Sequence, residues 1–372
     1  MGLPKDTEAN ILPLTETEPQ DGGKAPPALR FNPADIPDGG LQAWSVVIGG
    51  FCCMFVSFGW INCIGVFQEY YQTNQLSNFS PSTISWIPSL EAFMMFFGGP
   101  FIGKLYDNYG PRYILLVGSF LHVFGLMMTS ISSQYYQFIL AQGICSPIGA
   151  SMIFYPAMSV CSTWFFKRRA LAFGIMAAGS SLGGVTFPIM ITHLLPQVGF
   201  GWSMRIAAFI ILGLLIIANL TVRSRTPPHP RPLSLTEFIV PLKEPPFILV
   251  TVGSFLFFLG MLLPINYIIV YARRPPINMS ASLSSYLVPI LNAASLFGRV
   301  LPGYVGDKVG RFNTIIAMSF FTSIVCLALW IPASGNAATI VFATLYGFGS
   351  GTFVSMAPAV VAQITPDLSK IG

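Results

Sequence analysis

Charged residues are scarce in this chain. Only 9% of its 372 residues are Asp, Glu, Lys or Arg, whereas 53% are hydrophobic. Soluble domains carry about 25% charged residues. So few charges cannot cover the surface of a soluble protein of this length, which excludes a water-soluble fold. We therefore expect a lipid bilayer to surround most of the chain.

Groups that hold metals or perform catalysis are also few. The chain has three His and six Cys residues, and every cysteine falls inside an apolar run without metal-ligand spacing. No nucleophile–base pair, metal cluster or phosphate-binding loop stands out. We predict that the protein is not an enzyme and has no cofactor. The basic residues form short clusters between apolar runs, a pattern that does not favour a nucleic-acid partner, and the oligomeric state stays open.

Long apolar runs dominate what is there. A helix needs about 20 apolar residues to cross the hydrocarbon core. The chain has ten stretches of this kind, which predicts an all-α integral membrane fold. They lie near residues 43–67, 84–104, 113–132, 136–160, 169–194, 203–222, 247–271, 283–304, 312–331 and 337–359.

The distribution of Lys and Arg gives the predicted orientation. With ten crossings and a cytoplasmic N-terminus, most of the 19 Lys and Arg residues fall on the cytoplasmic side, and only Arg205, Arg273 and Arg274 fall on the outer side. This bias follows the positive-inside rule. We predict a multi-pass protein, with the plasma membrane as the default location.

The composition also predicts four regions. Residues 1–41 are polar and read as a disordered cytoplasmic tail, and residues 42–222 as a six-helix bundle. The Pro-rich, basic stretch 223–246 reads as a cytoplasmic linker, and residues 247–372 as a second, incomplete bundle of four helices.

One motif occurs twice, 200 residues apart. Gly103, Asp107 and Gly110 form Gly-x3-Asp-x2-Gly, and the same spacing recurs at Gly303, Asp307 and Gly310. Glycines and an Asp suit any tight loop. Their recurrence at equivalent places nevertheless favours an internal repeat, as in transporters whose substrate site lies between two related halves.

The first copy of this motif continues to Arg112, and in this form the chain resembles the major facilitator superfamily. Three stretches resemble its monocarboxylate transporter branch, especially the fungal members. They are Pro37-Asp38-Gly39-Gly40-Leu41-Gln42-Ala43-Trp44, Trp164-Phe165-Phe166-Lys167-Arg168-Arg169-Ala170-Leu171-Ala172-Phe173-Gly174, and Ala178-Gly179-Ser180. The resemblance implies a two-bundle transporter of twelve helices. With about ten, this sequence is expected to be truncated after the tenth.

The resemblance also implies a conformational latch between the bundles. Asp307 would bind the start of helix five, where Arg168 and Arg169 stand, and Asp107 would bind the start of helix eleven. The remaining latch residues are those of the two loops: Gly103, Gly110, Arg112 and Arg311. Alternatively, the basic residues before helix five only anchor the chain at the cytoplasmic surface.

Intramembrane polar groups are the candidate substrate contacts. The resemblance implies that Arg299 pairs with a substrate carboxylate, although it could instead snorkel to the cytoplasmic interface beside Asp307. Asn62 stands where the family has a lysine, and Ser295 where it has an aspartate. These departures leave the family's usual proton coupling without its groups.

Two further residues complete the candidate site. Asn292 could line a polar cavity on helix eight, and Glu91 is the remaining buried acid and the candidate proton site. The leading hypothesis is a carrier that moves a small organic anion, monocarboxylate-like, or an acidic secondary metabolite by alternating access. The alternative is a membrane receptor or sensor that does not transport, or an inactive truncated transporter.

Overall fold

The computed structural model describes residues 36–228 and 240–365. Within these residues the regular structure is helical and contains no β-strand. Eight helical stretches are long and apolar enough to cross a bilayer. The predicted all-α membrane class is therefore confirmed. Most of the predicted disordered tail (1–41) and part of the predicted linker (223–246) lie outside the described residues.

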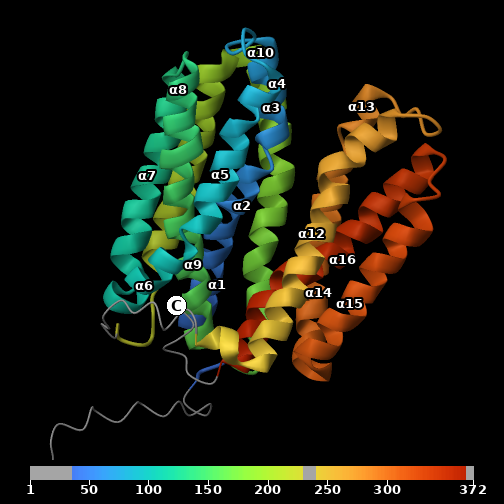
Figure 1. Ribbon diagram of the computed structural model, residues 1–372. Helices are drawn as coiled ribbons and strands as arrows, with labels where there is room; N and C mark the ends of the chain where they lie inside the picture. The colour runs from blue at the N-terminus through green and yellow to red at the C-terminus, as the bar shows by residue number, and fades with distance from the viewer. Residues whose placement is uncertain (1–35, 229–239, 366–372) are drawn as a thin grey trace, which may run out of the picture.

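The helices form two groups along the chain (Figure 1). The first group consists of α1 (Leu41–Val56), α2 (Phe58–Ile61), α3 (Ile64–Thr73), α4 (Pro81–Ile84), α5 (Trp86–Phe97), α6 (Gly99–Tyr109), α7 (Pro111–Ile131), α8 (Tyr135–Phe138), the π-helix η2 (Ile139–Cys145), α9 (Ser146–Trp164) and α10 (Arg169–Thr221). The second consists of the 3-10 helix η3 (Pro241–Lys243), α12 (Pro245–Arg273), α13 (Ala281–Ser284), α14 (Leu287–Val309), α15 (Arg311–Val325), the π-helix η4 (Cys326–Trp330) and α16 (Asn336–Ile364).

Each of the ten predicted spans is helical over most of its length, although only eight helical stretches in the described residues are long and apolar enough to cross a bilayer. Two details explain the difference. α10 joins two predicted spans, and it is broken at Gly199, where φ is +75° and the backbone leaves the helical region. The second predicted span is shared by α5 and α6, which have 12 and 11 residues. Either is too short to cross a core of about 30 Å alone, but only Gly98 separates them.

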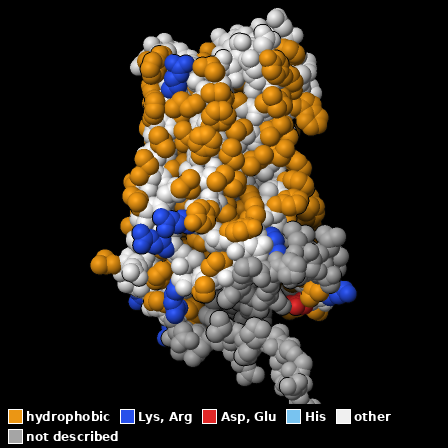
Figure 2. Space-filling model, turned by 90° about the vertical axis from the view of Figure 1, so that its left-hand side faces the viewer, with side chains coloured by type: hydrophobic (Ala, Val, Ile, Leu, Met, Phe, Trp, Pro, Cys, Tyr) orange, Lys and Arg blue, Asp and Glu red, His pale blue; other side chains and the backbone are white. Residues whose placement is uncertain are grey.

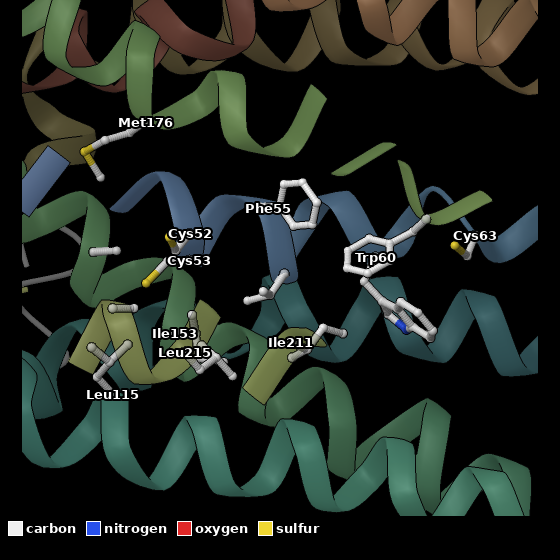
Figure 3. Close-up of a cluster of buried hydrophobic side chains, with 14 of the residues drawn as sticks. Cys52, Cys53, Phe55, Trp60, Cys63, Leu115, Ile153, Met176, Ile211 and Leu215 are labelled. Carbon is white, nitrogen blue, oxygen red and sulfur yellow. The ribbon is translucent and has the colours of Figure 1, made fainter. Parts of the chain in front are cut away.

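Each group of helices has its own hydrophobic core. The first core is built almost entirely from residues 43–222, and the second from residues 261–346. Figure 3 shows part of the first core, where Cys53, Phe55, Trp60 and Cys63 follow one another along helix one, the helix formed by α1, α2 and α3. Met356 and Ala359 of α16 also pack in the first core, so the two groups touch near the end of α16.

The two copies of the repeated motif adopt the same backbone form. Gly110 ends α6 with φ +72°, and Gly310 ends α14 with φ +104°. Both values lie in the region that favours glycine over residues with a side chain. In each copy the next helix begins at the following residue, Pro111 or Arg311, so the motif forms an abrupt helix–helix turn.

The outer surface suits a bilayer. Figure 2 shows a face that is largely hydrophobic, with Lys and Arg mainly toward its lower end. Exposed apolar side chains include Phe120 on α7 and Phe209, Ile216 and Leu220 on α10. In Figure 1 the two groups of helices converge where α1 begins and separate toward α4 and α13.

Candidate functional site

A polar seam joins the two groups of helices, along α10 and α14. On α14, Asn292, Ser295 and Arg299 follow one another at intervals of three and four residues, so they share one face of the helix. Because α10 and α14 are antiparallel, residues that come later in α14 contact residues that come earlier in α10. We call this contact, from Asn292 to Asp307 on α14, the α10–α14 seam.

Small residues allow the seam to close. A Cβ atom on Gly174 of α10 would overlap the carbonyl oxygen of Arg299, and one on Gly303 of α14 would lie 2.7 Å from the carbonyl oxygen of Ala170. Real Cβ atoms do not approach that closely. The two backbones therefore touch at positions that only glycine permits, as is common where membrane helices pack tightly.

An amide pair forms one end of the seam. Asn292 donates from Nδ2 to Oδ1 of Asn62 on helix one, over 3.2 Å. Gly184 of α10 packs beside both, since a Cβ there would lie 2.9 Å from Oδ1 of Asn292. The structure thus brings together two of the predicted substrate-contact residues, one from each group of helices.

The next contact along the seam joins two hydroxyl groups. The hydroxyl oxygens of Ser181 and Ser295 lie 2.6 Å apart, and both side chains are buried. Either hydroxyl can be the donor. Ser295 stands where the resemblance implies an aspartate. The contact between Ser181 and Ser295 therefore carries no charge.

Arg299 lies between Ser295 and Asp307 along the seam, and its side chain reaches across to α10. Its Nη1 donates to the carbonyl oxygen of Ala177 over 2.6 Å, and to the hydroxyl of Ser180. Its Nε is buried and has no hydrogen-bond partner in the described part of the chain. No carboxylate forms a salt bridge with it among the described residues. The guanidinium is thus a cation held by neutral groups, and it contacts α10 rather than snorkelling to Asp307.

The other end of the seam is the turn between α14 and α15, at the start of α10. Asp307 accepts from the backbone N–H of Ala170 at 3.0 Å and of Leu171 at 2.8 Å. Carboxylates stabilise helix N-termini in this way because the first N–H groups lack partners within the helix. Arg311 lies 3.0 Å from Asp307 and donates to the carbonyl oxygen of Phe166. We call this contact of Asp307 and Arg311 with residues 166–171 the latch.

The two predicted arginines at the latch differ sharply. Arg169 is 1% exposed and donates to the carbonyl oxygens of Phe165, Ser162 and Ala362. Ala362 belongs to α16, so this side chain also bridges the two groups of helices. Arg168 is exposed at the surface, and its backbone N–H donates a hydrogen bond to the carboxylate of Asp38.

A second polar cluster lies inside the first group of helices. Glu91 of α5 is 3% exposed and accepts from Nε2 of Gln142 at 3.2 Å. Oε1 of Gln142 in turn accepts from the hydroxyl of Tyr71, at 2.6 Å. The sequence pointed to Glu91, whereas Gln142 and Tyr71 carried no signal of their own.

The first copy of the repeated motif lies apart from these contacts. Gly103 is buried within α6, Asp107 lies on α6, and Arg112 is exposed near the start of α7. α6 and α7 pack against α9 in the first group. Among the contacts of the described residues, the second copy is the one that lies at the latch.

Asp38 was not predicted as a site residue. Its Oδ1 accepts from the backbone N–H groups of Phe166, Lys167 and Arg168 at 2.6, 2.7 and 3.3 Å. Trp44 packs edge-on against Phe165, with ring centroids 5.1 Å apart. The segment before helix one thus fixes the backbone that the latch uses. The Pro37-Asp38-Gly39-Gly40 stretch was the available signal.

Comparisons with known proteins agree with this architecture. Residues 47–370 match the family described as the Major Facilitator Superfamily. The chain is 58% identical to MFS-type transporter 1 of Ophiocordyceps sp. (strain BCC 1869) over 356 residues, which are 95% of this chain and 79% of that protein. It is 48% identical to the fujikurins efflux protein of Gibberella fujikuroi, over 96% of this chain and 78% of that protein.

Solved structures show the same fold at low identity. The E. coli fucose:proton symporter aligns with a TM-score of 0.68 and 13% identity, over 87% of this chain and 86% of that one. The same symporter in the outward conformation aligns with a TM-score of 0.67 and 15% identity, over 88% and 87% of the two chains.

Proposed function

Because the chain belongs to the Major Facilitator Superfamily, we propose that it exports an acidic secondary metabolite by alternating access, with Arg299 binding the anionic group. Relatives that share 48% and 40% of their aligned residues with it are named as efflux proteins for fujikurins and for aspyridones. The proposal extends to a monocarboxylate-like small anion, since a carboxylate is the group that Arg299 would recognise.

The uncompensated charge of Arg299 carries this proposal. A cation within the membrane is costly and marks a functional site by default. Arg299 is held only by the neutral Ala177 carbonyl and Ser180 hydroxyl, and its Nε has no partner in the described residues. A carboxylate could take two parallel hydrogen bonds from the planar guanidinium and neutralise it.

The polar side chains next to Arg299 in the seam could bind the uncharged part of a substrate. Neutral hydrogen-bond donors and acceptors lie between Arg299 and the Asn292 end of the seam, on Asn62, Asn292 and Ser295. When the two groups of helices separate, these side chains lose their partners across the seam. A substrate with hydroxyl or carbonyl groups would replace those partners, which gives the site polar selectivity without a second charge.

The seam also supplies the alternating gate. The positive-inside bias places the latch on the cytoplasmic side, so the described conformation is closed toward the cytoplasm. The helices separate toward α4 and α13 on the opposite side (Figure 1). Release of Asp307 from Ala170 and Leu171 would open the cytoplasmic side and expose Arg299 for loading. We propose the plasma membrane as the location, because export from the cell takes place there.

Flux measurements test the proposal. Vesicles containing the purified protein would be assayed with radiolabelled aromatic and aliphatic monocarboxylates and with extracts of acidic fungal metabolites. Arg299→Ala should lower flux at least about tenfold, as expected for a lost charge-assisted hydrogen bond, and Arg299→Lys should recover part of it. Arg274→Ala removes a positive charge from an exposed loop position and should leave flux unchanged.

Three outcomes separate the hypotheses. Flux that depends on Arg299 supports the carrier. Equal flux in the wild type and Arg299→Ala would overturn the assigned anion site. Binding that depends on Arg299, in a protein that moves none of the compounds, would instead indicate a receptor.

A further inference from the structure

Three phenylalanine rings from three helices meet in the first group of helices, close to the α10–α14 seam. Phe58 of α2 is the central ring. It packs against Phe96 of α5, with ring centroids 5.5 Å apart, and against Phe154 of α9, with ring centroids 4.8 Å apart. The three helices are neighbours within the first group (Figure 1). We call Phe58, Phe96 and Phe154 the aromatic cluster.

The aromatic cluster borders the candidate substrate site. Phe58 comes four residues before Asn62 on helix one, so the two side chains lie on one face of that helix. Asn62 binds Asn292 of α14, which shows that this face points toward the second group of helices. The amide of Asn62 also donates to the carbonyl oxygen of Phe58, over 2.8 Å. Phe58 therefore lies at the boundary between the two groups, one helical turn from the amide pair.

Phe58 and the guanidinium of Arg299 lie at a similar depth in the membrane. Gly59, which follows Phe58, packs on α10, since a Cβ on Gly59 would lie 2.7 Å from the Cα atom of Gly183. Arg299 binds the hydroxyl of Ser180, which precedes Gly183 by less than one helical turn. Side chains on a helix lean toward its N-terminus, which for helix one is the latch end. The ring and the cation thus lie at one depth, on different groups of helices.

The rings of the aromatic cluster are open to a partner. Phe96 is 53% exposed, and Phe58 and Phe154 are half-buried, whereas Phe138 and Phe187 of the first core are fully buried. Ligand sites typically combine aromatic walls with a few polar groups that fix the orientation of the ligand. The aromatic cluster and the neighbouring polar seam together have this composition.

Rings on the lipid-facing surface are arranged differently. Phe120 and Phe124 lie on one helix, α7, and stack with ring centroids 5.7 Å apart. Their contact follows from a spacing of four residues along a helix and needs no tertiary structure. The aromatic cluster instead forms where three helices meet beside the amide pair of Asn62 and Asn292. This placement favours a binding role over lipid contact.

The fold holds the aromatic cluster in place. Tyr155, next to Phe154 on α9, packs edge-on against the ring of Phe154 and donates from its hydroxyl to the carbonyl oxygen of Phe96, over 3.1 Å. Gly99 leaves room for this tyrosine, since a Cβ on Gly99 would lie 2.7 Å from the ring. Phe96 and Phe154 are thereby fixed relative to each other. Groups that are ordered before binding lose less entropy when a ligand docks on them.

We propose that the aromatic cluster binds a flat aromatic ring of the exported acid while Arg299 binds its anionic group. The inference rests on the proposed carrier function and adds the substrate class, aromatic carboxylic acids rather than aliphatic acids of the same size. The rings of Phe96 and Phe154 are inclined to that of Phe58 by 67° and 59°, so a flat ring can pack on the cluster offset or edge-on. A saturated ring of equal bulk would gain only the apolar contact.

A matched pair of acids tests this substrate class. Naphthoate and decahydronaphthoate carry the same carboxylate on the same two fused carbon rings, but only naphthoate is aromatic. The KM of each acid would be measured for flux in vesicles that contain the full chain. The parent protein should prefer naphthoate, by about twofold to tenfold for each aromatic contact that it makes.

Substitutions in the aromatic cluster should change this preference selectively. Phe58→Leu keeps an apolar side chain but removes the central ring. It should raise the KM for naphthoate about twofold to tenfold and leave the KM for decahydronaphthoate nearly unchanged. Phe154→Leu should act in the same direction, whereas Phe58→Tyr retains a ring and should retain the preference. Phe120→Leu removes an exposed ring from α7 and should match the parent.

The outcomes separate the substrate class from the carrier function. Equal preference in the parent, Phe58→Leu and Phe154→Leu would overturn the proposal, as would a parent that accepts both acids equally well. Flux of decahydronaphthoate that depends on Arg299, without any preference for naphthoate, would keep the carrier and contradict the aromatic class.

Equilibrium dialysis of the purified proteins in detergent provides a readout that needs no transport. It compares the Kd values of the two acids for the parent and each variant. A preference for naphthoate that depends on Phe58, in proteins that move neither acid, would support the aromatic cluster and count against the carrier function alone. A parent that binds neither acid would overturn the proposed role of the aromatic cluster.

Discussion

Asn292 on α14 donates a hydrogen bond to Asn62 on helix one, over 3.2 Å, across the boundary between the two groups of helices. The bond joins two neutral amides at the end of the α10–α14 seam farthest from the latch. It is therefore the contact that must break first if the opening at the α4 and α13 side extends toward the latch.

We predict that the two amides are energetically coupled. Asn62→Ala and Asn292→Ala should each favour separation of the seam, and the double variant should cost less than the two single effects combined. A coupling free energy of about 0.5–1.5 kcal/mol is expected for one neutral hydrogen bond. Spin labels on α10 and α14 would report the closed fraction in each variant. Strictly additive effects would show that the bond contributes nothing to closure.

A bulky side chain at Gly174 should hold the seam open. A Cβ there would overlap the carbonyl oxygen of Arg299, so Gly174→Val forces α10 and α14 apart. Overpacking of this kind costs about 1–3 kcal/mol, which should reduce the ratio of closed to open protein about fivefold to about 150-fold. Disulfide formation between cysteines introduced on the two sides of the latch would measure the closed fraction.

The matched control for this variant is Gly213→Val, in the part of α10 that follows the break at Gly199. A Cβ at Gly213 meets no atom within 4 Å, so the substitution adds the same side chain without contact across the seam. Its closed fraction should equal that of the wild type. A normal closed fraction in Gly174→Val would mean that the seam has more room than the structure shows.

The adjacent residues Arg168 and Arg169 should respond differently to the same substitution. Arg169 is buried and donates to three carbonyl oxygens, a geometry that the single ammonium of lysine cannot reproduce. Arg169→Lys should lower the stability by about 2 kcal/mol because buried acceptors lose their donors. The exposed Arg168→Lys should change it by less than about 0.5 kcal/mol. Thermal unfolding of the purified proteins in detergent measures both, and equal midpoints would refute the distinction.

Much of the fold could be predicted from the sequence because lipid imposes simple requirements. Apolar runs of about 20 residues must be helical in a bilayer, and each predicted run is helical here. The turns at Gly110 and Gly310 followed from the repeated motif, because a positive φ favours glycine. The joined spans at Gly199 were less evident, since a single residue marks the reversal within a continuous apolar stretch.

Only part of the candidate site could be predicted from the sequence. Arg299 and Asn292 stood out as polar residues in apolar runs, whereas Asn62 and Ser295 were singled out only through the family resemblance. The structure places all four at the interface between the two groups of helices. Their partners Ala177 and Ser181 belong to a stretch that reads only as small and helical. Hydrogen bonds across the seam depend on the register between two helices more than 100 residues apart in the chain, and register leaves no local pattern.

The sequence by itself determined that this chain is a helical membrane protein with two similar glycine turns between helices, because hydropathy and glycine conformation are properties of single segments. Only the tertiary structure decided that Arg169 and Arg299 bridge the two groups of helices, that Asp307 contacts the start of α10, and that Glu91 is buried beside Gln142. Those relationships arise from the packing of helices against each other, where a side chain's role depends on what another segment places beside it.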